Sequence, residues 1–407
     1  MELNPRRVAL LVAANTALAP FAIDAYLPAM EALADTIQAS IHHTELSISI
    51  FLLGFALGQL CFGPLSDRLG RKPVLTGGLT VFALASLALT QVDSLSSLLF
   101  IRFIQALGGG ACVVNSAAIV RDCFQGREAA RVMSTMAMIM MLAPLVAPSV
   151  GSALLHAVDW WLIFVFLAGY ALFLLWLLGT KLPETRDMTL PSASPRQVLS
   201  NYASILRHRE GMGYICAVAT TFAGLFAFVT ASPYVYMEYF SLSPALYPFV
   251  FGANVIIIAS SNRVNIYLLK TRTPQQNLRL GLAVQFTAAS LLVLITALGL
   301  NSLPVVVALV MCFTGMIGLI TPNSISSLLD HFGHISATAT ALLGGIQFSS
   351  GAFSGMMVGY FEIENMWPMV LMMLLASVVG NIGVRWLTPT PVPDTLSESQ
   401  AETDSRV

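Results

Sequence analysis

Charge is scarce in this sequence. Only 10% of its 407 residues are Asp, Glu, Lys or Arg, whereas 56% are hydrophobic and the mean hydropathy is +0.77. Soluble globular proteins carry about 25% charged residues, so this chain cannot cover a folded surface with polar groups and stay in water. The composition therefore predicts a protein whose solvent is largely lipid.

The residues that serve most enzymes and metal sites are also few or badly placed. Five cysteines are scattered with no CxxC pair, which favours neither a disulfide framework nor a zinc site. The six histidines fall in expected loops or at the ends of apolar runs, and no G-x-S-x-G motif occurs, so a membrane enzyme is disfavoured. We expect no enzyme activity, no metal and no cofactor.

Two further classes are excluded by the basic residues. A net charge of -1 argues against nucleic acid as a partner, because phosphate binding needs a basic surface. An ATP-driven pump needs the lysine of a P-loop, and none of the three lysines follows a glycine. Any energy source must then be an ion gradient.

Apolar runs dominate what is present. Twelve of them are long enough to cross a hydrocarbon core of about 30 Å as helices. They cover residues 8–26, 46–65, 73–90, 95–120, 129–155, 160–180, 212–236, 245–269, 278–300, 303–328, 335–361 and 368–387. Because period-2 alternation is absent, we expect an all-α membrane protein rather than a barrel.

The basic residues fall on one side of this predicted membrane. Nineteen of the 20 lie at the chain ends or in alternate loops, and the exception, Arg102, lies inside the fourth span. The first connecting loop, by contrast, carries only acidic charges. The positive-inside rule therefore predicts that both termini are cytoplasmic.

One long polar connection divides the chain. Residues 181–211 form a cytoplasmic linker between two six-helix bundles, residues 1–180 and 212–388, as expected for a duplicated transporter. Residues 389–407 are polar and proline-rich, and we expect a disordered cytoplasmic tail. One chain supplies both halves of a transport path, which predicts a functional monomer.

Two charges interrupt the spans: Asp24 in the first and Arg102 in the fourth. Each costs roughly 2.5 to 3.5 kcal/mol if unpaired at mid-membrane, which favours a functional role. Helix rise places them roughly 6 Å and 10 Å below the outer edge, so they could meet. An arginine would then stabilise the carboxylate while burial would disfavour it, as in a proton switch. The alternative is an interfacial acid and an arginine bonded to carbonyl groups.

The sequence between the second and third spans is distinctive. Gly63, Asp67, Arg68, Gly70 and Arg71 all fit the pattern G-x-L-[AS]-D-R-x-G-R-[KR]. This resembles the loop between helices two and three of the major facilitator superfamily. That resemblance implies twelve transmembrane helices in two pseudo-symmetric bundles that transport a small-molecule substrate by alternating access.

In this loop the glycines allow a tight turn and the basic residues hold the loop in the cytoplasm. We expect Asp67 to face the positive N-terminal end of a helix of the other half and so latch the cytoplasmic side shut. Arg121 and Asp122, at the end of the fourth span, are assigned to the same latch. The alternative is a topological anchor only.

Further motifs narrow the resemblance. Arg102 and Gln105 match the fourth-helix motif of the superfamily, whose arginine is implicated in proton coupling, although Ala106 replaces a usual glycine. The fifth span resembles the helix-packing motif of drug:proton antiporters, again with one glycine replaced, by Ala143. Its small and bending residues are Pro144, Pro148 and Gly151.

Short sequences spread over residues 5–388 are similar to the Bcr/CflA branch of the superfamily, including D-x-Y-L-P from Asp24 to Pro28 and L-P-E-T from Leu182 to Thr185. The resemblance implies a proton-coupled antiporter in the bacterial inner membrane. Its substrates would be antibiotics or other small amphipathic compounds of the bicyclomycin and chloramphenicol kind. A dedicated exporter of a metabolite, such as an amino acid or a siderophore, is the alternative.

A substrate cavity is expected between the halves at mid-membrane. Aromatic side chains and methionine adapt to apolar ligands, and isolated amides orient polar ones. The candidate lining residues are Tyr26, Asn115, Met138, Phe226, Tyr234, Asn254 and Gln347.

Overall fold

The computed structural model describes residues 5–124, 126–186, 194–361 and 365–388. Within these ranges the regular structure is helical, without strands. Twelve helices are long and apolar enough to cross a membrane, which confirms the all-α prediction and the number of spans. The predicted tail, residues 389–407, lies outside the described residues.

The spans, and the short helical turn η3 between the tenth and the eleventh, are built from the following elements. They are α1 (Pro5–Thr16), α2 (Leu18–Asp24), η1 (Leu27–Ala29), α3 (Met30–Thr36), α4 (Ile41–Leu69), α5 (Arg71–Leu89), α6 (Leu95–Cys123), α7 (Gly126–Ala157), α8 (Trp161–Lys181), α10 (Arg209–Pro233), η2 (Tyr234–Tyr239), α11 (Tyr247–Leu268), α12 (Pro274–Ala297), α13 (Leu303–Gly315), α14 (Ile317–Phe332), η3 (Gly333–Ile335), α15 (Ser336–Tyr360) and α16 (Trp367–Leu387). A thirteenth long helix, α9 (Pro195–Arg207), lies in the linker and was not anticipated.

The first span is longer than predicted and is broken near its middle. It runs from Ala9 to Thr36, whereas the predicted span ended at Tyr26. Asp24 therefore lies near the middle of the span and not close to its outer end. Proline has no N–H, so Pro20 and Pro28 each remove one helical hydrogen bond, to the carbonyl groups of Thr16 and Asp24. The helix is interrupted at Ala17 and again directly after Asp24.

Small residues let α4, α5 and α6 approach closely. A Cβ atom at Gly54 of α4 would lie 2.7 Å from the Phe103 carbonyl oxygen, and one at Gly108 of α6 would lie 2.6 Å from that of Gly78. The same Gly54 faces Ala106. The alanine that replaces a usual glycine in this motif is therefore accommodated by a glycine on the neighbouring helix.

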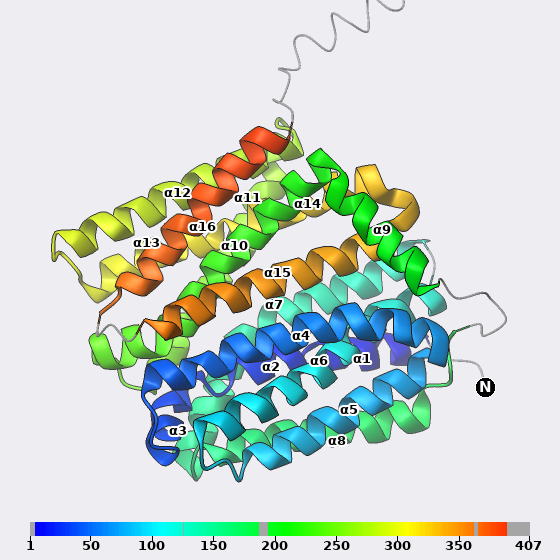
Figure 1. The fold of residues 1–407 in the computed structure, drawn as a ribbon, viewed down its shortest axis with the longest axis horizontal. Coiled ribbons are helices and arrows are strands. Elements are labelled where there is room, and N and C mark those ends of the chain that lie inside the picture. Colours follow the sequence, from blue (N-terminus) through cyan, green and yellow to red (C-terminus); the bar gives the residue numbers. More distant parts are fainter. Residues whose placement is uncertain (1–4, 125, 187–193, 362–364, 389–407) are drawn as a thin grey trace, which may run out of the picture.

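Figure 1 shows helices α1 to α8 gathered on one side of the molecule and α10 to α16 on the other, with α4 and α15 side by side between them. Contacts along this pair join Gly345 to Leu60 and Gly359 to the His42 carbonyl oxygen and Leu46. We call the surface where α4 meets α10, η2 and α15 the seam. It brings the two groups of helices together.

The linker helix α9 is capped at its N-terminus by Ser194, whose side chain accepts a hydrogen bond from the Gln197 N–H. Its Tyr202 is partly buried, and burial, followed by the charges of Cys61 and Asp67, raises the pKa of the Tyr202 phenol. The helix packs against α10 and α15. We call the end of the molecule that carries Asp67 the basic end, because it holds most of the arginines that the structure describes.

Candidate functional site

Arg102 lies on α6 with no exposed surface. Its guanidinium donates one hydrogen bond to Gln105 Oε1 at 2.6 Å and another to the Ala22 carbonyl oxygen at 3.0 Å. It also lies over two rings, 4.4 Å from the centre of Tyr26 and 4.5 Å from that of Phe51. These contacts hold a positive charge in an apolar interior and tie α6 to the broken first span.

Asp24 lies at the end of α2 and is 5% exposed. No hydrogen bond or ion pair joins its carboxylate to Arg102 among the described residues. Instead, the arginine binds the carbonyl group two residues before it. The direct pair that helix depth allowed is thus absent from this conformation, and the carbonyl contact is the one that the alternative interpretation named for Arg102.

The break at Asp24 is packed tightly against α7. A methyl group at Gly151 would overlap the carbonyl oxygen of Ala25, so the two backbones are in contact. Pro144 and Pro148 lie within α7, and Ala143 and Ala147 are buried. The small residues that sequence assigned to helix packing therefore include one that contacts the residue next to Asp24.

Tyr26 and Tyr247 connect this region to its neighbours. The Tyr26 hydroxyl shares a hydrogen bond of 2.9 Å with Ser47 Oγ on α4. The Tyr247 hydroxyl, on α11, is 2.7 Å from Ser232 Oγ on α10. Tyr26 therefore joins the break after Asp24 to α4, and Tyr247 joins two helices of the second group.

At the basic end, a charged network joins three helices. Arg71 donates to Asp67 Oδ1 at 2.6 Å and to Asp122 Oδ2 at 2.9 Å, and Asp67 also accepts from Arg186 at 3.2 Å. The partners of Asp67 are thus in the same loop and in the segment after α8. The predicted contact with a helix end of the other half is not among its contacts in this conformation.

Glu184 completes this network, and sequence reasoning did not assign it a role. Its carboxylate accepts from the backbone N–H groups of Arg71 at 2.8 Å and Lys72 at 3.1 Å, at the N-terminus of α5. A carboxylate is stabilised there by the helix dipole. Gly70, with φ of 99°, makes the turn that aims these N–H groups at it. The L-P-E-T motif, which contains Glu184, was the feature of the sequence that could have indicated this role.

The other three residues assigned to the latch make fewer contacts. Arg68 is exposed, and Arg121 donates only to the Ala117 carbonyl oxygen, at 3.3 Å. Gly63 faces Val114 across the α4–α6 contact, where a Cβ atom would be 3.4 Å from Cγ2.

Three of the predicted substrate residues lie in well-defined buried positions. Asn115 is fully buried, and its Oδ1 has no hydrogen-bond partner among the described residues. Asn254 accepts a hydrogen bond from Thr314 at 2.9 Å, within the second group of helices. Phe226 is 6% exposed, and its ring lies 6.2 Å from that of Phe348 on α15.

Two other predicted substrate residues, Met138 and Gln347, are less buried. Met138 is 53% exposed on α7, on the same exposed face as Leu142. Gln347 is half-buried beside Phe348, whose ring meets Phe55 of α4 at 4.8 Å, so it lies close to the seam.

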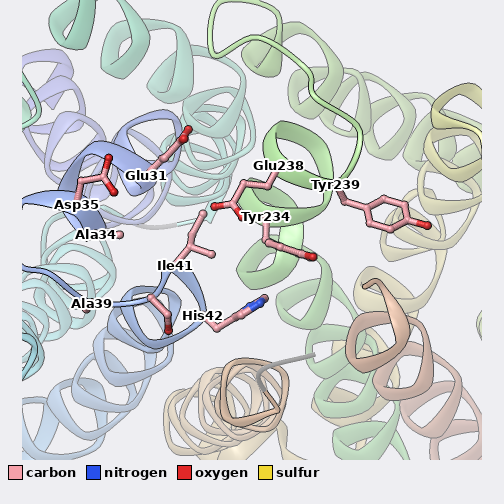
Figure 2. A pocket seen from close by; sticks show the side chains of 10 residues that line it. Glu31, Ala34, Asp35, Ala39, Ile41, His42, Tyr234, Glu238 and Tyr239 are labelled. Carbon is pink, nitrogen blue, oxygen red and sulfur yellow. The ribbon is translucent and has the colours of Figure 1, made fainter. Parts of the chain in front are cut away.

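Tyr234 lines a cavity of about 630 Å³ at the end of the molecule opposite the basic end. Figure 2 shows Glu31 and Asp35 of α3 on one side of it, Glu238 and Tyr234 of η2 on another, and His42 of α4 pointing toward Tyr234. The two rings are 4.5 Å apart. The mouth of this cavity is therefore acidic and aromatic and is built by both groups of helices.

Comparison with known proteins places these features in one family. Residues 12–356 match the Major Facilitator Superfamily. The chain is 31% identical over 373 residues to the bicyclomycin resistance protein homolog of Haemophilus influenzae, covering 91% of this chain and 93% of the relative. It is 29% identical to the chloramphenicol resistance protein of Pseudomonas aeruginosa, with coverage of 91% and 88%.

A solved structure shares the fold. A partially occluded inward-open conformation of the xylose transporter XylE from E. coli superimposes with a TM-score of 0.71 at 14% sequence identity, covering 95% of this chain and 98% of that chain. At this identity the likeness concerns the arrangement of the helices alone.

Proposed function

The chain belongs to the Major Facilitator Superfamily and is a multi-pass membrane transporter, and we propose that it exports antibiotics or other small amphipathic compounds in exchange for protons. Its resistance-protein relatives match it over nearly their whole lengths, which supports drug efflux. We further infer that it works in the bacterial inner membrane, surrounded by lipid, as a monomer and without enzymatic chemistry.

The basic end faces the cytoplasm in this proposal, with both termini on that side. The support is the charge distribution: in the sequence, nineteen of 20 basic residues fall at the chain ends or in alternate loops, and the cavity at the opposite end is lined by carboxylates. The two halves, residues 1–180 and 212–388, rock about the seam, and the substrate binds between them. The Asp67–Arg71–Asp122 network moves with the first half.

The observation that carries proton coupling is the carboxyl group of Asp24, buried where the first span is broken. A broken helix in a membrane is tolerated where it lines a functional site, and a buried acid there is costly without a use. Asp24 takes up a proton when the path opens outward and releases it when the path opens inward. The Arg102 guanidinium donates a hydrogen bond to the Ala22 carbonyl group, so a movement of the segment around Asp24 changes the contacts of the arginine.

Proteoliposomes test this proposal. Efflux of chloramphenicol driven by an imposed pH gradient is measured for wild type, Asp24→Asn and Asp93→Asn, the last being an exposed carboxyl group in the turn before α6. We expect Asp24→Asn to lose gradient-driven efflux and Asp93→Asn to retain it. Undiminished gradient-driven efflux by Asp24→Asn contradicts proton coupling through this residue. Wild-type transport of amino acids with no transport of any antibiotic favours the metabolite exporter.

A further inference from the structure

A second buried acid, Glu45, has no place in the mechanism above. It lies in the second turn of α4, at the seam, and is 1% exposed. Neither carboxylate oxygen has a hydrogen bond of ordinary geometry among the described residues. The nearest basic group is His42 Nδ1, 3.8 Å away on the preceding turn. A charged carboxylate in this position would be poorly stabilised.

The groups that face Glu45 come from several elements. His42 shares its helix, and the Tyr234 backbone and the Glu238 carboxylate come from η2. The contacts from α15 and α16, at Val358 and Met369, are apolar. Among these described neighbours, only His42 can carry a positive charge, while Glu238 adds a negative one.

The seam around Glu45 contains further polar groups without partners. Two buried hydroxyl groups here, those of Ser49 on α4 and Thr230 on α10, have no hydrogen-bond partner among the described residues. Both lie against Gly355 of α15, where an added Cβ atom would come within 2.7 Å of each. Buried polar groups in folded proteins are normally satisfied, and these line both sides of one contact. A surface of this kind is stabilised by water when the two sides separate.

The cavity at the outer end gives this seam a route to solvent. His42 and Tyr234 line both that cavity and the small space against which Glu45 lies. In Figure 2 these two side chains meet from opposite halves of the molecule. The His42–Tyr234 contact therefore lies between the outer cavity and the space beside the Glu45 carboxyl group.

We propose that Glu45, together with His42, is a second proton-binding site, and that its proton holds the outer seam closed. When Glu45 is protonated, the closed contact buries a neutral acid. When the proton leaves, the closed contact must bury a carboxylate near Glu238, so the seam opens and water solvates the carboxylate and the hydroxyl groups of Ser49 and Thr230. The role of this site in transport rests on the proposed exchange of drug for protons. The dependence of the seam on pH does not, because it can be measured without substrate.

The test measures the seam directly. In a cysteine-free background, spin labels are placed at Val158 and Leu300, which are 59% and 64% exposed in loops at the outer end of the two halves. The distance between them is recorded in lipid nanodiscs from pH 5 to pH 9 without substrate. One proton bound in the closed form alone changes the closed-to-open ratio by about tenfold per pH unit across the transition.

We expect wild type and Asp93→Asn to open as pH rises, and Glu45→Gln to remain closed at every pH. Glu45→Leu, which also removes the charge, gives the same result and guards against a folding defect of one variant. A wild-type distance that does not respond to pH overturns the proposal, as does an unchanged response in both Glu45 variants. A response lost in His42→Gln but kept in Glu45→Gln assigns the proton to histidine alone and also overturns it. Asp24→Asn keeps the pH response, so a failure of Asp24 coupling is distinguishable from a failure here.

Discussion

Replacing Gly151 by alanine tests whether the close contact at the broken first span is required for transport. The added methyl group would overlap the Ala25 carbonyl oxygen and approach Ala25 C at 2.6 Å and Cα at 3.2 Å. All three atoms belong to the backbone, so no side-chain rotation relieves the overlap. The first span and α7 must move apart next to Asp24.

Overpacking of this kind costs about 1–3 kcal/mol. If the contact is present in one conformation of the transport cycle and absent in another, the same free energy changes the ratio of their populations by roughly 5- to 150-fold. The predicted effect is therefore a reduced efflux rate together with a lower melting temperature in the conformation described here.

The matched control is Gly77→Ala on α5, where nothing lies within 4 Å of an added methyl group. Alanine is favoured over glycine in a helix by up to about 1 kcal/mol, so this variant should keep its stability and its transport rate. Thermal unfolding of the purified proteins and gradient-driven efflux from proteoliposomes give the two readouts. The reasoning fails if Gly151→Ala behaves like Gly77→Ala in both.

Two other substitutions follow from the site. Arg102→Lys keeps the charge, but a lysine cannot bind Gln105 and the Ala22 carbonyl group together. The loss of one charged hydrogen bond of about 2 kcal/mol should reduce the rate of gradient-driven efflux roughly 30-fold. An unaltered rate would show that the two hydrogen bonds of the guanidinium group are not needed. Gly70→Ala places a side chain at φ of 99° and crowds the Glu184 carboxylate, so the free energy of unfolding should fall by about 1–2 kcal/mol. Gly169→Ala, where the added methyl group faces open space, is the control in the same thermal unfolding experiment.

The positions and contacts of Asp24 and Arg102 differ between the prediction from sequence and the structure. Sequence identified both as the charges inside the spans, because a charge is conspicuous in an apolar run. It placed Asp24 roughly 6 Å below the outer edge, because the helix rise was counted from a span of residues 8–26. The structure continues the span to Thr36, because prolines on either side of Asp24 bend the chain without ending it.

Glu45 and Glu184 show what was missed. Glu45 was counted with the acidic residues outside the membrane, because three other acids precede it and only tertiary contacts bury it. Glu184 belongs to a polar linker that gave no sign of folding back onto the start of α5, 112 residues earlier in the chain. Asp67, Arg71 and Asp122 do lie together at one end of the molecule, but the partners of Asp67 could not be predicted from the loop alone.

The number of spans, the helical class and the one-sided distribution of basic charge were determined by the sequence by itself, because lipid as a solvent restricts which residues each segment can contain. The tertiary structure alone decided which polar groups meet: a carbonyl group rather than a carboxylate on Arg102, a glycine against the backbone beside Asp24, and a buried acid at the seam. These choices depend on which faces of distant helices come together. Apolar periodicity says that a face is buried, but it does not say which neighbouring helix covers it.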